Sequence, residues 1–244
     1  MTTRNIAVIG SSGAIGKALT QQLAASFTEA SIYTFSRYKA TRQQQLPGTQ
    51  CIHTVIDYDN ESSIQAAAAT AASNCPLDMV IVATGMLYDD LLMPEKSLND
   101  LSAEKFVRLF AVNSILPAIL AKHFIPALNK QGRSLFAALS ARVGSISDNA
   151  LGGWYAYRAS KAALNMIIKN AAIETKRRNK AAIVVGLHPG TVDSHLSKPF
   201  QANVPEHRLF TPDFSAQKLV QVLTGLTSQS SGKCFAWDGR EIAP

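Results

Sequence analysis

Cysteine, charge and long apolar runs are all scarce in this sequence, and each scarcity excludes a class of protein. The 244-residue chain has three cysteines, Cys51, Cys75 and Cys234, an odd and scattered set with no C-x-x-C spacing. Such a set does not build a disulfide framework, so we expect small buried thiols in a reducing compartment. Charged residues make up only 17% of the chain and hydrophobic residues 47%, which excludes a disordered protein.

Signals for membranes and metals are also missing from the sequence. No run approaches the 18 or so continuous apolar residues of a membrane-spanning helix. The N-terminal MTTRNIAVIGSSG is not a signal peptide, because its apolar run is short and breaks into glycine rather than a cleavage site. We therefore expect a cytoplasmic protein without membrane association. The five histidines lack the close ligand spacing of a metal site: His53, His123, His188, His195 and His207.

The formal net charge of +7 raises the question of an anionic partner. The best local candidate for nucleic-acid contact is TKRRNK at 175–180, which is short, lacks interleaved aromatic residues and falls where a helix should end. Cations at that point complement the helix dipole, so we interpret the cluster as a solvated helix end and expect no nucleic-acid partner. A phosphate-bearing cofactor explains part of the excess charge more simply.

Short apolar runs alternate with helical segments along the whole chain. We expect strands at 5–9, 31–35, 51–56, 78–83, 134–139, 181–187 and 233–237. We expect helices at 14–27, 62–73, about 102–128, 152–178 and 213–226. This alternation predicts an α/β fold with one doubly wound parallel sheet, Rossmann-type, and helices on both faces. No linker or repeat divides the chain, so we expect residues 1–244 to form a single dinucleotide-binding catalytic domain. The irregular stretch at 191–212 is a candidate lid.

The first expected strand runs into IGSSGAIGKAL, which carries Gly10, Gly13 and Gly16 at the start of a helix. Glycines in this context allow a tight turn, close approach of the backbone to a pyrophosphate, and close helix–strand packing. We therefore predict a dinucleotide site here, with Ser12 and Ile15 beside the glycines. The alternative is an ordinary glycine-rich turn.

The end of the second strand distinguishes between the two nicotinamide dinucleotides. An acidic residue there binds the ribose 2′-hydroxyl of NAD, whereas arginine accommodates the 2′-phosphate of NADP. The sequence TFSRYK places Ser36 and Arg37 there, with no carboxylate. NADP(H) is therefore the preferred cofactor and NAD(H) the alternative, unless Arg37 is a surface arginine with no ligand.

The segment WYAYRASKAALN places Tyr157 four residues before Lys161, on one face of a helix. A nearby cation favours phenolate, so we expect the pKa of Tyr157 to fall from about 10 toward neutrality, which suits proton transfer. An amphipathic helix produces the same spacing by chance, and the pair needs support from the rest of the chain.

Taken in order, these motifs resemble those of the short-chain dehydrogenases/reductases. YAYRASK carries the family's Tyr-x-x-x-Lys, LSARVG offers Ser140, FAVNSILPA offers Asn113, and HPGTVDS resembles the Pro-Gly segment that borders the nicotinamide. The stretches SISDNALGGWYAYRASKAALN, HPGTVDSHLSKPF and SGKCFAWDGREI are most similar to the branch that contains C-factor-type signalling proteins and small carbonyl reductases.

The resemblance implies roles for individual residues. Tyr157 is the acid/base, Lys161 lowers its pKa and binds the nicotinamide ribose, and Ser140 holds the substrate carbonyl oxygen. Asn113 holds open a water-linked proton path to Lys161, and Asp57 faces the adenine amino group. Taken alone, Ser140 and Asp57 would suit caps equally well, and Asn113 would be a satisfied polar residue near a kink. Further cofactor contacts are implied at Ala83, Gly85, Pro189, Gly190, Val192 and Ser194.

The chain departs from the family pattern without losing a catalytic group. Ala14 stands where the family's Gly-x-x-x-Gly-x-Gly pattern has its middle glycine, and Ile9 replaces the threonine often found before the first glycine. Ser194 replaces the threonine usually found near the nicotinamide amide, and VATG (82–85) replaces Asn-Asn-Ala-Gly. The loop between Ser140 and Tyr157 is longer than usual. Several apolar residues belong either to a substrate pocket or to the core: Leu87, Val143, Trp154, Leu196 and Phe200.

These motifs predict an NADP(H)-dependent oxidoreductase that transfers hydride between the nicotinamide and a small, largely apolar carbonyl or alcohol substrate. The alternative is a cofactor-bound, C-factor-like signalling or regulatory protein with incidental turnover. A nucleotide-sugar epimerase is disfavoured, because too few residues follow Pro189-Gly190 for a substrate domain. Helices at 102–128 and 152–178 pair between subunits in many relatives, so we expect a homo-oligomer.

Overall fold

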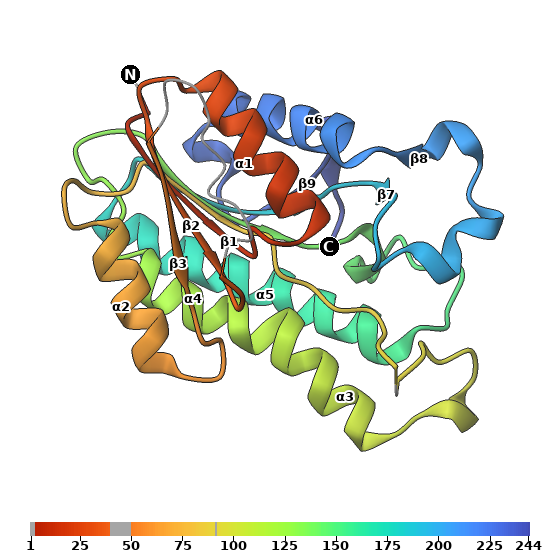
Figure 1. Cartoon of the computed structure of the whole chain (residues 1–244). Helices are drawn as coiled ribbons and strands as arrows, with labels where there is room; N and C mark the ends of the chain where they lie inside the picture. Colours follow the sequence, from red (N-terminus) through yellow and green to blue (C-terminus); the bar gives the residue numbers. More distant parts are fainter. Residues whose placement is uncertain (1–2, 40–49, 91) are drawn as a thin grey trace.

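The computed structural model describes residues 3–39, 50–90 and 92–244, and a central sheet between two layers of helices dominates it (Figure 1). The strands of the central sheet are β1 (Asn5–Ile9), β2 (Ser31–Ser36), β3 (Gln50–Val55), β4 (Met79–Val82), β5 (Ser134–Leu139), β6 (Ala182–His188), β9 (Cys234–Ala236) and β10 (Glu241–Ile242). The helices are α1 (Ala14–Ser26), α2 (Glu61–Ala71), α3 (Ala103–Phe110), α4 (Leu116–Phe124), α5 (Tyr155–Arg178) and α6 (Pro212–Gly225). Shorter turns are η1 (Leu98–Asp100), η2 (Ala111–Ile115), η3 (Arg142–Gly144), η4 (Lys198–Asn203), η5 (Glu206–Arg208) and η6 (Ser228–Ser230).

The strand order is β10-β9-β6-β5-β4-β1-β2-β3, and every neighbouring pair is parallel except β9 with β10. The predicted doubly wound sheet is therefore confirmed. The order reverses between β1 and β4, because the chain builds β2 and β3 on one side of β1 and then returns to the other. In such sheets ligands bind in the crevice beyond the carboxyl ends of the strands at this reversal.

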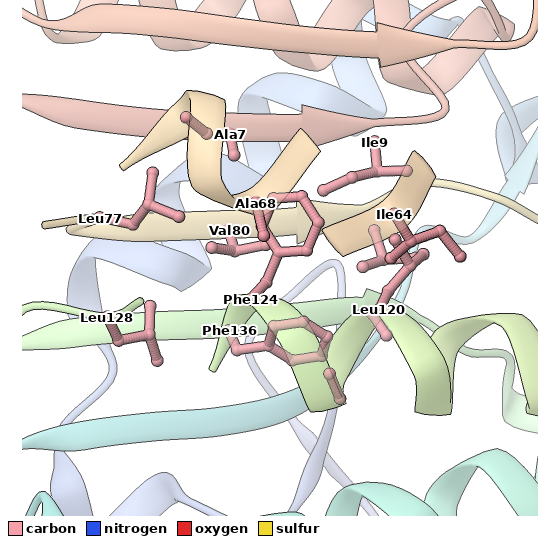
Figure 2. Close-up of a cluster of buried hydrophobic side chains, with 14 of the residues drawn as sticks. Ala7, Ile9, Ile64, Ala68, Leu77, Val80, Leu120, Phe124, Leu128 and Phe136 are labelled. Atoms are coloured by element: carbon pink, nitrogen blue, oxygen red, sulfur yellow. The ribbon is translucent and has the colours of Figure 1, made fainter. Parts of the chain in front are cut away.

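Helices cover both faces of the sheet because its central strands are apolar on both sides. Side chains alternate along β1: Ala7 and Ile9 join the cluster beneath α2, α4 and α5, while Ile6 and Val8 face α1 and α6. Figure 2 shows part of the first cluster, where Phe124 of α4 lies against the sheet. Burying a side chain of this size contributes about 2 kcal/mol to folding. The two cores fix the strand ends that carry the site.

The single helix expected over 102–128 is interrupted and shorter. A π-helical turn, η2, separates α3 from α4, and α4 ends at Phe124, before Pro126, whose ring removes a backbone donor. By length and mean hydropathy the stretch Ala103–Phe124 is the one described helical stretch that meets the criteria for a membrane span. Its residues Leu116, Leu120 and Phe124 pack in the core beneath the sheet, as in the core helix of a layered α/β protein.

The lid segment, residues 191–212, is more ordered than the expected irregular loop. Its ends form a small parallel pair, β7 (Thr191–Val192) with β8 (Leu209–Phe210), and η4 lies between them. The pairing ties both ends of the lid segment together beside β6. The sequence pattern also missed the edge strand β10. Among the cysteines only Cys234 is buried, whereas Cys51 and Cys75 are half-buried.

Candidate active site

Helix α5 carries three polar side chains at four-residue spacing on one face: Tyr157, Lys161 and Asn165. Tyr157 is 8% exposed and Lys161 only 3%. The Lys161 ammonium lies 5.9 Å from the centre of the Tyr157 ring and donates a 2.8 Å hydrogen bond to the main-chain carbonyl of Leu139, at the end of β5. The predicted Tyr–Lys pair therefore occupies one buried site.

The expected fall in the pKa of Tyr157 is wrong for this structure. Burial raises the pKa of Tyr157 to about 12, because removing water disfavours the phenolate. The same burial lowers the pKa of Lys161 to about 8, a fall that the charge of Cys234 slightly offsets. Desolvation thus governs the pKa values of both groups, and Tyr157 carries its proton at neutral pH.

Ser140 follows β5 and is 4% exposed. Its N–H donates to the Leu187 carbonyl of β6 at 2.7 Å, and its hydroxyl donates to the Asn165 side-chain oxygen at 2.6 Å. Ser140 is therefore not a helix cap. Asn165 was not among the predicted site residues, although its position four residues after Lys161 puts it on the face that carries Tyr157 and Lys161.

Asn113 is fully buried in the π-helical turn η2. Its side chain accepts a 2.9 Å bond from the Met86 N–H and donates one of 2.8 Å to the Met86 carbonyl. It also donates to the Ser160 hydroxyl at 3.2 Å. Asn113 therefore fixes the loop after β4 to α5, next to the site.

Two glycines keep the surroundings of Lys161 close-packed. A Cβ on Gly85 would lie 3.7 Å from the Lys161 Nζ and 3.8 Å from the Asn113 Oδ1, so Gly85 lies beside both residues. A Cβ on Gly144 would lie 2.8 Å from the Lys161 main-chain carbon, which leaves no room for a larger residue. Gly144 was not predicted from the sequence, because its role depends on the tertiary packing of η3 against α5.

The glycine-rich turn after β1 has the close packing that its pattern predicts. Gly10 has φ +84°, and a Cβ there would meet the Ala83 carbonyl carbon at 2.9 Å. A Cβ on Gly16 would lie 2.2 Å from the Gly10 oxygen, whereas one on Gly13 would lie at 3.5 Å, an ordinary contact. Gly10 and Gly16 are therefore sterically required, and Gly13 is not.

The same turn fits an anionic group of a dinucleotide. Helix α1 has neither a side-chain cap nor an acidic residue in its first turn, so its N–H groups and dipole face the space beside Gly10. Ser12 is exposed there and Ile15 is half-buried. The buried hydroxyl of Thr84, next to Ala83, has no hydrogen-bond partner among the described residues. A polar ligand at this turn would satisfy these groups.

Arg37 lies at the end of β2, exposed, with its guanidinium 5.7 Å from the centre of the Tyr38 ring. Tyr58 lies nearby, and burial raises its pKa to about 12 despite the opposing influence of Arg37 and the Gly10 backbone. The sequence analysis did not identify Tyr58. Asp57 is exposed and accepts a 3.0 Å bond from the Asp59 N–H, the turn interaction considered as its alternative role.

The Pro-Gly segment after β6 packs against an aromatic cluster. Gly190 has φ +80°, and a Cβ there would lie 2.6 Å from the Phe210 ring. The Pro189 carbonyl accepts a 2.8 Å bond from Ser215. Val192 is buried, and its carbonyl accepts a bond from the Ser194 hydroxyl at 3.2 Å. These contacts fix the segment against β8 and α6.

The five apolar residues singled out in the sequence lie in one cluster with Tyr157; they are Leu87, Val143, Trp154, Leu196 and Phe200. The same cluster contains Met86, Tyr88, Phe106, Leu109 and Ala156. Trp154 lies edge-to-face against Tyr157 at 6.2 Å and against Phe200 of the lid segment at 5.0 Å between ring centres. Tyr88 stacks on the exposed His195 and donates a 2.6 Å bond to its carbonyl. Aromatic residues thus connect the lid segment to Tyr157.

Among the described residues, no group of three histidine, cysteine or carboxylate side chains could hold a metal ion. The geometry instead combines a buried phenol, an ammonium and a hydroxyl with a glycine-rich turn on the same edge of the sheet. This arrangement suits proton transfer to or from a substrate beside a dinucleotide.

The comparison with protein families agrees with this site. Residues 4–205 match the short chain dehydrogenase family, so the chain belongs to that family. The resemblance of the sequence motifs is thereby confirmed, including the C-factor-like branch.

Individual relatives include both signalling and enzymatic proteins. The chain is 33% identical to the C-signal of Myxococcus xanthus over 146 residues, which are 60% of this chain and 82% of C-signal. It is 30% identical to the 1-hydroxy-2-glutathionyl-2-methyl-3-butene dehydrogenase of Rhodococcus sp. (strain AD45) over 185 residues, 75% of this chain and 76% of that protein. The NADPH-bound carbonyl reductase from chicken fatty liver shares the fold, with a TM-score of 0.82, 23% identity and 100% of both chains covered.

Proposed function

We propose that this short-chain dehydrogenase is an NADPH-dependent carbonyl reductase. The observation that carries the proposal is the buried Tyr157, with Lys161 and Ser140 beside it, on the same sheet edge as the Gly10–Gly16 turn. A relative of the same fold is an NADPH-bound carbonyl reductase, which supports this choice within the family.

Bound NADPH would supply hydride to the carbonyl carbon of the substrate. The chain's own residues would handle the charge that develops on oxygen. Tyr157 would donate its proton to that oxygen, and a pKa of about 12 keeps this proton in place at neutral pH until the more basic alkoxide oxygen takes it. The Ser140 hydroxyl would donate a hydrogen bond to the same oxygen, after rotating away from Asn165.

Lys161 and Asn113 would support Tyr157 in this role. Lys161 would bind the nicotinamide ribose, and its ammonium would replenish the Tyr157 proton by way of that ribose. Asn113 would hold open the water-linked path to Lys161, a role supported by its burial and by its closeness to Gly85.

We assign the other cofactor contacts to residues at the carboxyl ends of the strands, one part of the dinucleotide at a time. Gly10, Ser12, Gly13, Ile15 and Gly16 would bind the pyrophosphate at the N-terminus of α1. The adenosine half would contact Arg37, at its 2′-phosphate, and Asp57, Ala83 and Gly85. The nicotinamide half would contact Pro189, Gly190, Val192 and Ser194.

The substrate we propose is a carbonyl compound with an apolar, planar group. The Trp154 ring lies against Tyr157 and the Phe200 ring lies against Trp154, and Leu87 adds an apolar side chain to the same cluster. Flat rings pack against such faces with favourable edge and stacking contacts. Small hydrophilic aldehydes would gain little from this surface.

The test is a pair of titrations of the purified protein with NADPH and NADH, followed by tryptophan quenching or calorimetry, and then assays with aryl ketones. We expect tighter binding of NADPH. Arg37→Ala should weaken NADPH binding roughly 10- to 100-fold, because a charge-assisted bond to phosphate is lost, and should leave NADH binding unchanged. Arg178→Ala, an exposed arginine at the far end of α5, is the matched control. Equal binding of both nucleotides by the wild type would contradict the cofactor assignment.

A second candidate function is supported by the similarity to the Myxococcus C-signal. In that case the chain would be a cofactor-bound signalling or regulatory protein, and turnover would be incidental. The buried Tyr157–Lys161 pair favours the enzyme, because a binding module has no need for two costly buried polar groups.

We also propose that a single-domain homo-oligomer acts in the cytoplasm. Exposed apolar residues on η2, α3 and α5 would form the contact: Val107, Ile115, Met166 and Ile173. Size-exclusion chromatography tests this proposal. The wild type should elute as an oligomer and Ile173→Asp at a smaller size.

A further inference from the structure

Helix α5 begins after three consecutive residues in left-handed backbone conformation. Their φ angles are +64° at Gly152, +66° at Gly153 and +51° at Trp154. Among the described residues Trp154 is the only non-glycine residue with positive φ. Such a conformation is unfavourable for a bulky L-amino acid, and surrounding contacts must hold it in place.

Glu95 supplies contacts on the N–H side of this turn. Its main-chain carbonyl accepts a 2.6 Å bond from the Trp154 N–H, and its side-chain Oε2 accepts a 3.3 Å bond from the Ala156 N–H. Arg158 acts on the carbonyl side, where its Nε donates to the Gly152 and Gly153 carbonyls at 3.2 and 3.0 Å. The turn is therefore held from two directions, by the main chain of Glu95 and by the side chain of Arg158, while the Glu95 side chain caps the first turn of α5.

The burial of Glu95 calls for an explanation. The residue is 1% exposed, and its Oε1 has no hydrogen-bond partner within the part of the chain that the structure describes. A half-satisfied buried carboxyl group is costly. Helix α5 has no acidic residue in its first turn, and the Trp154 side chain makes no capping bond. Glu95, from a distant loop, takes over that capping function.

This capping fixes the N-terminal end of α5, which carries Tyr157. The Trp154 ring lies 6.2 Å from the Tyr157 ring and 5.0 Å from the Phe200 ring. Ala156, whose N–H Glu95 accepts, directly precedes Tyr157. A shift in this first turn would move both the aromatic wall and the proton donor.

We propose that Glu95 is a positioning residue of the active site. It holds the left-handed turn 152–154 and the first turn of α5, and through them it sets the positions of Trp154 and Tyr157. The proposal deepens the carbonyl reductase function and rests on it for its kinetic consequences. Its structural consequence, the placement of Trp154, does not depend on any turnover.

The test compares Glu95→Ala and Glu95→Gln in the full chain. Glu104→Ala, in the exposed first turn of α3, is the matched control. The chain has two tryptophans, so 5-fluorotryptophan labelling gives ¹⁹F NMR signals for Trp154 and Trp237, assigned with Trp154→Phe. The kinetic readouts are kcat, KM for an aryl ketone and the Kd for NADPH.

We expect Glu95→Ala to shift or broaden the Trp154 signal and leave that of Trp237 in place. Its kcat should fall about tenfold or more, since small misplacements of a catalytic group are costly, while the Kd for NADPH stays unchanged. Glu95→Gln should recover much of kcat, because its amide oxygen still accepts the Ala156 N–H. Glu104→Ala should match the wild type throughout.

Two results would overturn the proposal. The first is an unchanged Trp154 signal with unchanged kcat in Glu95→Ala. The second is a parallel loss of both tryptophan signals and NADPH affinity in both Glu95 variants, which would assign Glu95 to overall folding. If the wild type binds NADPH yet reduces no carbonyl compound, the proposed function fails, and the Trp154 signal alone decides the role of Glu95.

Discussion

The hydroxyl group of Ser140 donates a 2.6 Å hydrogen bond to the side-chain oxygen of Asn165, eight residues beyond Tyr157 on α5. The Asn165 amide in turn donates to the Gly144 carbonyl at 3.4 Å. Helix α5, which carries Tyr157, thus sets the position of the Ser140 oxygen in this structure.

Asn165→Ala should lower kcat/KM for carbonyl reduction about tenfold, because the free enzyme no longer holds the Ser140 oxygen in the position from which its hydroxyl proton turns to the substrate. NADPH affinity should not change, since Asn165 is far along the helix from the glycine-rich turn. Steady-state kinetics with a parallel nucleotide titration measure both effects. The exposed Asn170→Ala serves as control, and a kcat/KM equal to the wild type would show that Ser140 needs no such support.

Tyr157→Phe should reduce turnover by roughly 10²- to 10⁴-fold, because the general acid is lost. The ring and its contacts with Trp154 are retained, so the fold and NADPH binding should persist. Single-turnover assays and NADPH titration provide the measurement. If the biological phenotype of a strain carrying Tyr157→Phe matched that of the wild type, the signalling function would replace the enzymatic one.

Lys161→Met should inactivate the protein and yet stabilise it at pH 7. The pKa of Lys161 falls from 10.5 to about 8 by burial, so below pH 8 the fold bears the full cost of a buried charge. Between pH 8 and 10.5 the unfolded chain binds more protons, and wild-type stability rises with pH. Removing the ammonium should raise the free energy of unfolding at pH 7 by about 3 kcal/mol and abolish that rise.

Urea denaturation at pH 7 and pH 9.5 measures this effect, with the exposed Lys169→Met as control. The range stays below pH 10, where the raised pKa of Tyr157 begins to act in the opposite sense: its contribution to stability is lost as pH rises from 10 to 12. A less stable Lys161→Met at pH 7 would mean that the hydrogen bond to the Leu139 carbonyl outweighs the cost of burial.

Gly16→Ala and Gly13→Ala compare a crowded and an open position in the same glycine-rich turn after β1. A Cβ at position 16 would lie 2.2 Å from the Gly10 oxygen and would displace the turn, whereas one at position 13 would lie 3.5 Å away. Gly16→Ala should therefore lose about 1–3 kcal/mol of stability and most of its NADPH affinity. Gly13→Ala should resemble the wild type in thermal unfolding and calorimetry, and equal effects of the two changes would contradict the observed packing.

The sequence predicted the sheet well because the information for it is local. Apolar runs such as NIAVI and DMVIVA, each followed by a helical segment, identify buried parallel strands without any knowledge of their neighbours. The Tyr157–Lys161 pair follows equally from helix geometry, since four residues return the chain to the same face. The glycine-rich turn is recognisable because it directly joins a strand to a helix.

The parts that the sequence could not predict depend on contacts between distant segments. Asn113 lies in a π-helical turn where simple periodicity predicts a continuous helix. Tyr88 meets His195 of the lid segment, 107 positions later, and Glu95 meets Ala156, 61 positions later. Turn composition and helix propensity carry no signal for such pairs.

The sequence by itself determined the strand and helix order, the glycine-rich turn after β1 and the Tyr157–Lys161 pair on one helix face, because each depends on local spacing. Tertiary structure decided how those groups behave. Packing removed water from Tyr157 and Lys161, and their pKa values followed burial rather than mutual attraction. It also positioned Trp154 and Phe200 beside the phenol, since only the folded chain brings residues from separate loops into one desolvated site.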